Sequence, residues 1–335
     1  MTAHRGTVTI ADVARHAGVS AATVSRVMNG RFAGDSEVAD RVRDSAAELA
    51  YAPSPLARSL ALGRTHAIAF VVPDLANPAF QSVLAGLSKT AALDGYRVLV
   101  ADSGESPSEE GPLAAEIRRR TDAIVLCAPR MPADELVSLA AQLQPLVLIN
   151  RTLPQVSAPS LSIDYRAGIA SIAEHLYSLG HRSLAYVYGP ERSASNAHRE
   201  RGLEDFLRDH PDVHLERISA GAGSEDGRAA APAVRDTGAT AALAFNDLVA
   251  IGLIGGLREL GLSVPEQVSV TGFDDIPLAQ YLAPALTTAS VPHADLGVLA
   301  WQRMRDLIHG EQPAHDVVFQ PRLEVRASSG PVLRD

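Results

Sequence analysis

The sequence predicts an α/β protein in which a small N-terminal helix-turn-helix unit precedes a doubly wound body of two lobes. Two short helical patterns separated by a glycine-containing turn predict the N-terminal unit. Over the rest of the chain, short apolar runs alternate with helical patterns, which predicts buried parallel strands and covering helices. The runs are too many for one such sheet, and 335 residues exceed the usual size of a single core.

The first helix is expected to begin after Thr9, because Thr9 and Asp12 have the spacing of a capping box. Gly18 suits the left-handed position that ends such a helix. Ser20 is a favourable cap for a second helix, which ends near Asn29. A third helical pattern follows and completes a three-helix unit.

The second helix has a plain outer face, which consists of Ala21, Ala22, Ser25, Arg26 and Asn29. Small side chains in the first turn of a helix let its backbone approach the bases of a major groove, and Arg26 in the following turn can donate two hydrogen bonds to guanine. Residues 1–64 hold eight arginines against six acidic residues, a charge of +2, which leaves −11 for the rest of a chain of net charge −9. The pattern favours DNA binding over the alternative, a three-helix packing module with a solvated face.

Residues 51–64 form a linker whose sequence contains the signals of a short helix. Ser54 can cap a helix, Pro55 suits its first position, and Leu56 and Leu60 lie one turn apart. So short a helix is unstable alone, so we expect it to form against a partner surface. The alternative is a tether whose leucines dock on the body.

The strands predicted for the body are the apolar runs 67–72, 97–101, 123–126, 146–149, 184–188, 241–245 and 268–272. Between them, residues 80–93 and 165–179 have helical patterns. Ligands of doubly wound folds bind beyond the carboxyl ends of the strands. At those ends this sequence carries carboxylate, amide, guanidinium and aromatic side chains, which can bind a polyol or a heterocycle.

The sequence lacks the motifs of common enzyme classes. The glycines of residues 221–227 miss the dinucleotide-binding spacing by one residue, no P-loop or Gly-x-Ser-x-Gly motif is present, and the eleven histidines show no metal-ligand spacing. The single cysteine, Cys127, fits a reducing cytosol, and no run is long enough to span a bilayer. We therefore expect a cytoplasmic protein that is not an enzyme, needs no cofactor or metal, and has no membrane partner.

The stretch TIADVARHAGVSAATVSRVMNG resembles, nearly position for position, the N-terminal signature of the LacI/GalR family of bacterial transcriptional regulators. The resemblance implies base contacts by Ala21, Ala22 and Arg26. It also implies phosphate contacts, by Thr9, Ser20, Thr23 and Ser25. Residues 51–64 resemble the hinge helix of the family, in which Leu60 would wedge into the minor groove and Ala57 would approach the DNA closely.

The body resembles the effector domain of the same family, a type I fold shared with periplasmic sugar-binding proteins. The motifs that carry this resemblance are DLANPAF (74–80), RERGL (199–203), FND (245–247), GFDD (272–275) and ALTT (285–288). They imply an effector pocket between the lobes, lined by Asn77, Phe80, Arg199, Asn246 and Asp274. The expected domains are a helix-turn-helix domain (1–50), a hinge (51–64) and an effector-binding domain (65–335), with an N-lobe of about 65–163 and 292–321 and a C-lobe of about 164–291 and 322–335.

Together these features predict a ligand-responsive transcriptional regulator, a repressor, that binds a pseudo-palindromic double-stranded DNA operator as a homodimer. A small effector between the lobes, either a sugar or sugar derivative or a nucleoside or purine, would change its operator affinity. The alternative is a transport protein of the periplasmic sugar-binding type. Such a protein would share the body but would have no use for residues 1–60.

Overall fold

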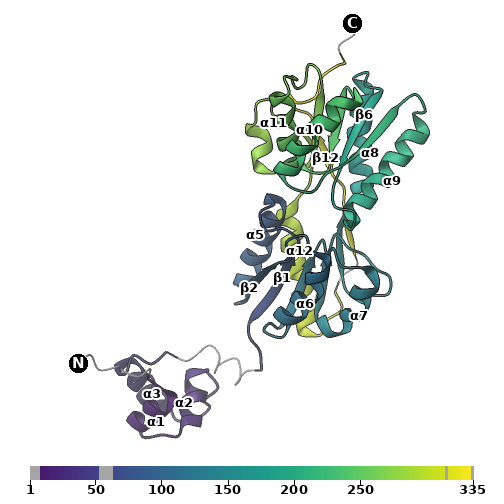
Figure 1. The fold of residues 1–335 in the computed structure, drawn as a ribbon. Coiled ribbons are helices and arrows are strands. Elements are labelled where there is room, and N and C mark those ends of the chain that lie inside the picture. Colours follow the sequence, from purple (N-terminus) through teal and green to yellow (C-terminus); the bar gives the residue numbers. More distant parts are fainter. Residues whose placement is uncertain (1–7, 53–62, 314–315, 333–335) are drawn as a thin grey trace. The chain divides into compact units, whose positions relative to one another are not determined.

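The structure is a computed structural model that describes residues 8–52, 63–313 and 316–332. The chain forms two compact units, Met1–His66 and Ala67–Asp335 (Figure 1). The predicted hinge residues Ala57 and Leu60 lie outside the described residues. Among the described helices, none combines the length and the apolar character needed to cross a bilayer.

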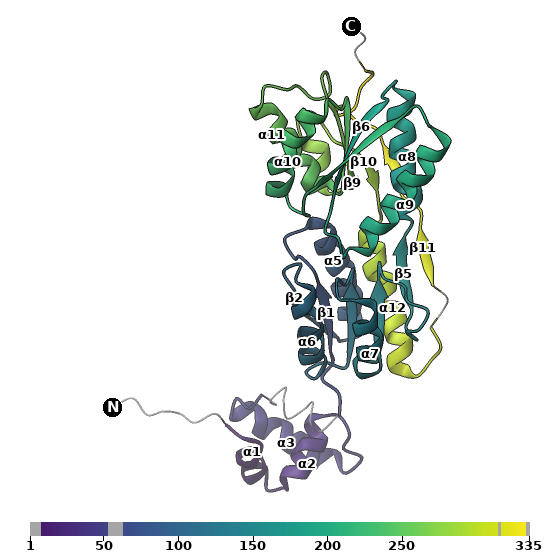
Figure 2. The same ribbon diagram turned by 45° about the vertical axis from the view of Figure 1, so that its right-hand side comes forward.

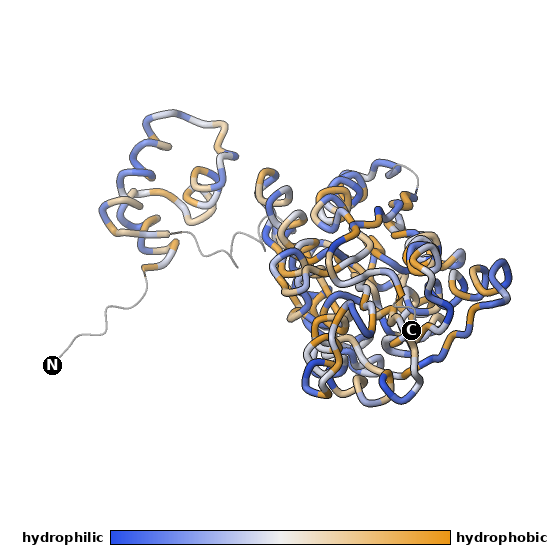
Figure 3. Tube along the Cα trace, turned by 90° about the horizontal axis from the view of Figure 1, so that it is seen from above, coloured by the Kyte–Doolittle hydropathy of each residue, from blue (hydrophilic) through white to orange (hydrophobic). Residues whose placement is uncertain are grey.

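The first unit is the expected helix-turn-helix domain. Its three helices are α1 (Ile10–Ala17), α2 (Ala21–Met28) and α3 (Ser36–Glu48). Apolar and polar residues alternate along these helices (Figure 3), and the apolar faces meet around Val13, Val24 and Val42, which are fully buried. Gly18 has a φ of 67°, a left-handed conformation that lets the chain turn sharply between α1 and α2.

The second unit contains two six-stranded sheets. The first has the order β11-β5-β4-β3-β1-β2, with β1 (Ala67–Val72), β2 (Arg97–Asp102), β3 (Ala123–Cys127), β4 (Leu146–Ile149), β5 (Ser160–Ile163) and β11 (Val317–Phe319). The second has the order β12-β10-β9-β8-β6-β7, with β6 (Ser183–Tyr188), β7 (His214–Ser219), β8 (Ala241–Ala244), β9 (Ser269–Asp274), β10 (Thr287–Ser290) and β12 (Arg322–Glu324). Neighbouring strands are parallel except for β10 and β12.

Helices cover both faces of each sheet (Figures 1 and 2). They are α5 (Pro78–Leu93), α6 (Pro107–Arg118), α7 (Ala133–Leu143), α8 (Tyr165–Ser178), α9 (Ala194–Asp209), α10 (Ser224–Thr237), α11 (Asp247–Glu259), the 3-10 helix η1 (Pro277–Tyr281) and α12 (His293–His309). Side chains of a strand alternate between faces, so Phe70 of β1 packs in the cluster with α5 and α12, while Val71 packs with α6 and α7. Burial on both faces explains why the central strands β1, β3, β4 and β8 are continuously apolar in the sequence.

The chain passes between the two sheets three times: between β5 and β6, between β10 and α12, and between β11 and β12. These connections contain Asp164, Val291 and Pro321. Each lobe is therefore built from separate parts of the sequence. A relative movement of the lobes can occur at these connections without breaking either sheet.

All seven apolar runs correspond to strands, whose ends differ from the predicted ones by at most two residues. The sequence analysis missed five strands: β5, β7, β10, β11 and β12. Their residues lack a long apolar run, because β7 is an exposed edge strand and β10 is rich in threonine. Thr287 and Thr288 of β10 are nevertheless fully buried, since their hydroxyls donate to the carbonyl oxygen of Arg326 and the carboxylate of Asp247.

We predict that Gly252→Ala lowers the melting temperature of the protein by several degrees. A Cβ at Gly252 of α11 would lie 1.7 Å from the carbonyl oxygen of Ser224 in α10. Overpacking of this kind costs about 1–3 kcal/mol or more and outweighs the gain of about 1 kcal/mol in helix propensity. Thermal unfolding followed by circular dichroism measures the change.

Gly255→Ala is the matched control in the same helix, because nothing lies within 4 Å of its Cβ position. It should leave the melting temperature unchanged or raise it by about 2–4 °C, the usual shift for 1 kcal/mol in a domain of this size. Equal shifts of both variants in the same direction would contradict the close approach of α10 and α11.

Candidate DNA-binding face and interlobe pocket

The outward face of α2 lies in solvent as expected. Ala21, Ala22 and Arg26 are exposed, whereas Ser25 and Asn29 are half-buried. The Nε of Arg26 donates to the carbonyl oxygen of Ala22 at 3.4 Å, and its outer guanidinium nitrogens have no partner among the described residues. The face therefore has small side chains in its first turn and a guanidinium group with free donors, as the sequence predicts for base contacts.

Of the four residues assigned to phosphate contacts, Thr9, Ser20 and Thr23 lie at the N-terminal ends of α1 and α2, and Ser25 lies in the middle of α2. The Oγ of Ser20 accepts from the backbone N–H of Thr23 and lies 2.9 Å from the Thr23 hydroxyl oxygen. The carboxylate of Asp12 accepts from both the backbone N–H and the hydroxyl of Thr9, and these bonds lower the pKa of Asp12. Helix N-termini with exposed hydroxyls suit phosphate groups, although the Thr9 hydroxyl is already bonded to Asp12.

A pocket lies between the lobes of the second unit, where strands of both sheets have their carboxyl ends. Its lining includes all five residues that the resemblance implied: Asn77, Phe80, Arg199, Asn246 and Asp274. The cavity volume is about 30 Å³, room for about one water molecule. Because small-molecule sites usually have about 300–1,000 Å³, the lobes must separate before a ligand of that size enters.

Arg199 is the most deeply buried charged group of this pocket, with an exposed fraction of 1%. Its guanidinium carbon lies 4.4, 4.6 and 4.1 Å from the ring centroids of Tyr165, Phe245 and Phe273. Cation–π contacts of this kind stabilise the charge, but Nε and Nη1 have no hydrogen-bond partner. Buried donors without partners are costly, so these nitrogens point to an acceptor on a bound ligand.

Asp274 is held in the pocket by an unusual turn. Its φ of 114° and the φ of 57° at Asp275 are both positive. The turn is fixed by Asp247, whose fully buried carboxylate accepts from the backbone N–H of Ile276 at 2.8 Å. Burial raises the pKa of Asp247 well above its usual value, and the charge of Asp274 adds to this effect.

Two of the three asparagines that line the pocket, Asn77 and Asn246, also begin helices. The Oδ1 of Asn77 accepts from the N–H of Ala79 at the start of α5. The Oδ1 of Asn246 accepts from the N–H of Val249 in α11, and its Nδ2 donates to the carbonyl oxygen of Ala222. Each side chain therefore has a capping role before it meets any ligand, which holds it rigidly at the edge of the pocket.

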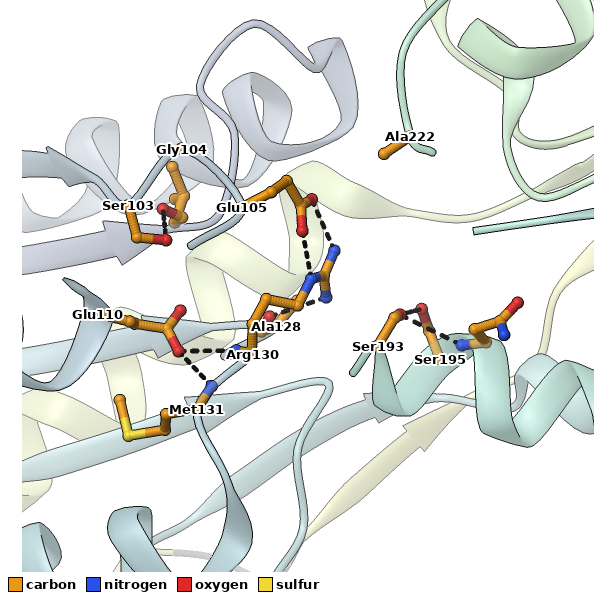
Figure 4. A network of polar contacts seen from close by, with 12 residues as sticks. Ser103, Gly104, Glu105, Glu110, Ala128, Arg130, Met131, Ser193, Ser195 and Ala222 are labelled. Atoms are coloured by element: carbon orange, nitrogen blue, oxygen red, sulfur yellow. Dashed lines mark hydrogen bonds and ion pairs between the residues drawn. The ribbon is translucent and has the colours of Figure 1, made fainter. Parts of the chain in front are cut away.

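The sequence analysis missed several polar residues of the pocket, among them Glu105, Arg130, Asn150 and His293. Arg130 donates from Nε and Nη2 to the two carboxylate oxygens of Glu105, at 2.6 and 2.9 Å. The buried carboxylate of Glu110 accepts from the backbone N–H of Arg130 and fixes its loop (Figure 4). Figure 4 also shows Ser195 and Ala222 of the other lobe facing this pair.

Two of these residues carried a signal that the sequence analysis did not use. Arg130 and Asn150 closely follow β3 and β4, which were both predicted, so the expectation that ligands bind beyond the carboxyl ends of the strands applied to them as well. His293 follows β10, which was not predicted. Its Nε2 lies 3.5 Å from Oδ1 of Asp274 but makes no hydrogen bond.

An exposed helix that suits a DNA groove, joined to a two-lobed body with a buried polar pocket, defines a DNA-binding protein that responds to a ligand. Residues 9–54 match the family described as "Bacterial regulatory proteins, lacI family". Residues 173–329 match the "Periplasmic binding protein-like domain". The transcriptional repressor CytR of Escherichia coli K12 is 30% identical to this chain over 309 residues, which cover 90% of both chains.

Solved structures agree with this assignment. The lac repressor dimer bound to operator and the anti-inducer ONPF matches with a TM-score of 0.83 and 25% identity, over 96% of this chain and 99% of that one. A complex of the transcriptional regulator CelR with cellobiose matches with a TM-score of 0.71 and 25% identity, over 96% and 99%. The chain belongs to the lacI family of bacterial regulatory proteins and is a DNA-binding transcriptional regulator. The expected family and fold class are confirmed, and the transport alternative is not favoured.

We predict that Arg199→Met raises the melting temperature of the ligand-free protein by about 2–6 °C. The substitution removes a buried charge whose Nε and Nη1 have no partner, and such groups cost about 1–3 kcal/mol. The apolar side chain keeps the contact with the three aromatic rings. Differential scanning calorimetry checks the shift, and a fall in melting temperature would mean that the cation–π contacts outweigh the missing hydrogen bonds.

Proposed function

We propose that the protein is a homodimeric repressor whose affinity for a pseudo-palindromic operator is changed by a small effector bound in the interlobe pocket. The observation that carries the proposal is the meeting of Asn77, Phe80, Arg199, Asn246 and Asp274 in one pocket, with unpaired donors on Arg199. Functionally, residues 1–50 would bind DNA, 51–64 would form the hinge, and 65–335 would bind effector. Since the partner is bacterial DNA, we place the protein in the cytoplasm.

In the proposed complex, α2 enters the major groove and Arg26 bonds a guanine, with Ala21, Ala22 and Asn29 beside it. Thr9, Ser20, Thr23 and Ser25 contact phosphates. For the hinge the support is the resemblance of residues 51–64 to the hinge helix of the family, which implies that Leu60 and Ala57 lie at the minor groove. Two copies of this arrangement match an operator with two half-sites.

Exposed apolar side chains support self-association. Leu93 at the end of α5 is 82% exposed, and Leu99 and Val100 lie exposed in β2, the edge strand of the first sheet. In the second lobe Tyr281 is 77% exposed. Large apolar groups and an open sheet edge are typical of surfaces that another chain covers.

The charges of the pocket favour a neutral, polar effector. Arg199 and Arg130 are balanced by Asp274 and Glu105, and the amides add further donors and acceptors. Such a lining suits the hydroxyl groups of a sugar or sugar derivative, or those of a nucleoside, with Phe80 as an apolar surface. The CelR relative was solved with cellobiose, which supports a sugar.

We also infer that the protein has no enzymatic activity and needs no cofactor. Burial raises the pKa of Cys127 to about 12, so its thiol is protonated at neutral pH and is a poor nucleophile. Within the described residues, no three His, Cys, Asp or Glu side chains are arranged to hold a metal ion.

For the DNA-binding face, we predict that Arg26→Ala relaxes the preference for one guanine in each half-site. The loss of a two-donor contact should reduce discrimination at that base by about 1–3 kcal/mol. Binding to a base-substituted operator series, with the operator found by selection from random DNA at fixed salt, measures the effect. An unchanged base preference would remove Arg26 from base recognition.

For the effector pocket, we predict that a sugar or nucleoside raises the melting temperature of the wild type but not of Arg199→Ala. A ligand at a hundred times its Kd stabilises the folded state by about 2.7 kcal/mol. The matched control is Arg192→Ala, an exposed arginine outside the pocket lining, which should keep the full shift. Operator binding by Arg199→Ala should persist, and a normal ligand shift in this variant would exclude Arg199 from the site.

A further inference from the structure

A second pocket of about 610 Å³ lies beside the effector pocket. The first lobe contributes the segment after β4 and the end of β5, and the second lobe contributes one face of α9. Figure 2 shows the N-terminal end of α9 next to β5 and β11. The volume is within the usual range of small-molecule sites, about 300–1,000 Å³.

The lining of this pocket has an excess of positive charge. Arg151 from the first lobe and Arg201 from the second contribute to it, whereas burial lowers the pKa of His198, which also lines the pocket, and so favours its neutral form. Among the described residues, neither arginine forms an ion pair or a side-chain hydrogen bond, whereas neighbours such as Arg166 pair with acidic residues. Arg151 is half-buried, so its charge has lost part of its contact with water without gaining a partner.

The acidic residue of the lining, Asp164, offsets only one of the two guanidinium charges. Asp164 uses Oδ1 to accept from the backbone N–H of Ala167, at 2.9 Å. Its Oδ2 accepts from Nε2 of Gln320, at 3.1 Å. Hydrogen bonds from neutral donors do not cancel the charge of Asp164, so two arginines against one aspartate give the lining a net charge of +1.

Neutral donors of the kind that bind oxyanions line the same pocket. Thr152 and Ser162 contribute hydroxyl groups, whose oxygens lie 3.3 Å apart, and the Thr152 oxygen also lies 2.7 Å from the Oγ of Ser160. Ala194, the first residue of the 16-residue helix α9, also lines the pocket, so the positive end of that helix faces it. Guanidinium groups, hydroxyls and a helix N-terminus together form the usual set of phosphate and carboxylate ligands.

We propose that this pocket binds a small metabolite that carries a phosphate or carboxylate group, and that it is a site distinct from the effector pocket. An anion here contacts Arg151 of one lobe and Arg201 of the other, so it favours the arrangement that brings the two lobes together. Asn150 and Tyr165 line both pockets, and Tyr165 is stacked against Arg199. Occupation of the anion site therefore changes the affinity of the effector pocket for its effector. Binding of the effector changes the affinity for the anion by the same factor.

Calorimetric titration of the full-length protein tests the site, with inorganic phosphate in one arm and citrate in the other, both at constant ionic strength. We expect saturable binding of one anion per chain in at least one arm, and that arm distinguishes a phosphate site from a carboxylate site. Arg151→Gln and Arg201→Gln should each weaken binding by about tenfold or more, because each removes a charge-assisted hydrogen bond. Arg201 is exposed, so its variant should fold normally.

Arg119→Gln is the matched control, since this exposed arginine at the end of α6 is outside the pocket and its loss changes the net charge equally. It should bind the anion as the wild type does. Hydrogen exchange should show protection at residues 150–153 and 194–201 when the anion is present. Absence of saturable binding in both arms, or equal weakening by Arg119→Gln, would overturn the proposal and would leave the effector pocket unaffected.

Discussion

The interlobe pocket depends on the buried guanidinium of Arg199. Three aromatic rings from α8, β9 and the end of β8 surround it, but they leave two of its nitrogens without a hydrogen-bond acceptor. A buried donor without a partner destabilises the ligand-free protein. A ligand that supplies the acceptor removes this destabilisation, so such donors are found where function requires them. The rest of the pocket places acceptors and donors around this one charge.

Rigid helix starts and one strained turn place those other groups. Asn77 and Asn246 cap α5 and α11, and Asp247 fixes the turn that carries Asp274. Since these side chains are bonded to the backbone of each lobe, their positions move with the lobe as a whole. A ligand that contacts the groups of both lobes therefore binds with an affinity that depends on the separation of the lobes. Allostery requires such a difference in affinity between two arrangements.

The second pocket suggests that more than one metabolite controls this separation. Its cations come from both lobes, and Asn150 and Tyr165 form a wall that it shares with the effector pocket. Asn150 has a left-handed backbone, with a φ of 56°, and a buried Oδ1 without a partner. Because Asn150 lines both pockets, a ligand that moves this residue in one pocket changes the lining of the other.

By itself the sequence determined the helix-turn-helix unit, the family and seven strands, because periodic apolar patterns and short motifs are local signals. It also named five residues that line the interlobe pocket, whose role in binding an effector stays a prediction. Tertiary structure decided what depends on residues distant in the chain: the burial of Thr287 and Thr288, the Glu105–Arg130 pair, and the place of His293 beside Asp274. The second pocket is also a feature that depends on residues distant in the chain. Its cations lie about fifty residues apart, and only the packing of α9 against the end of β5 brings them to one cavity.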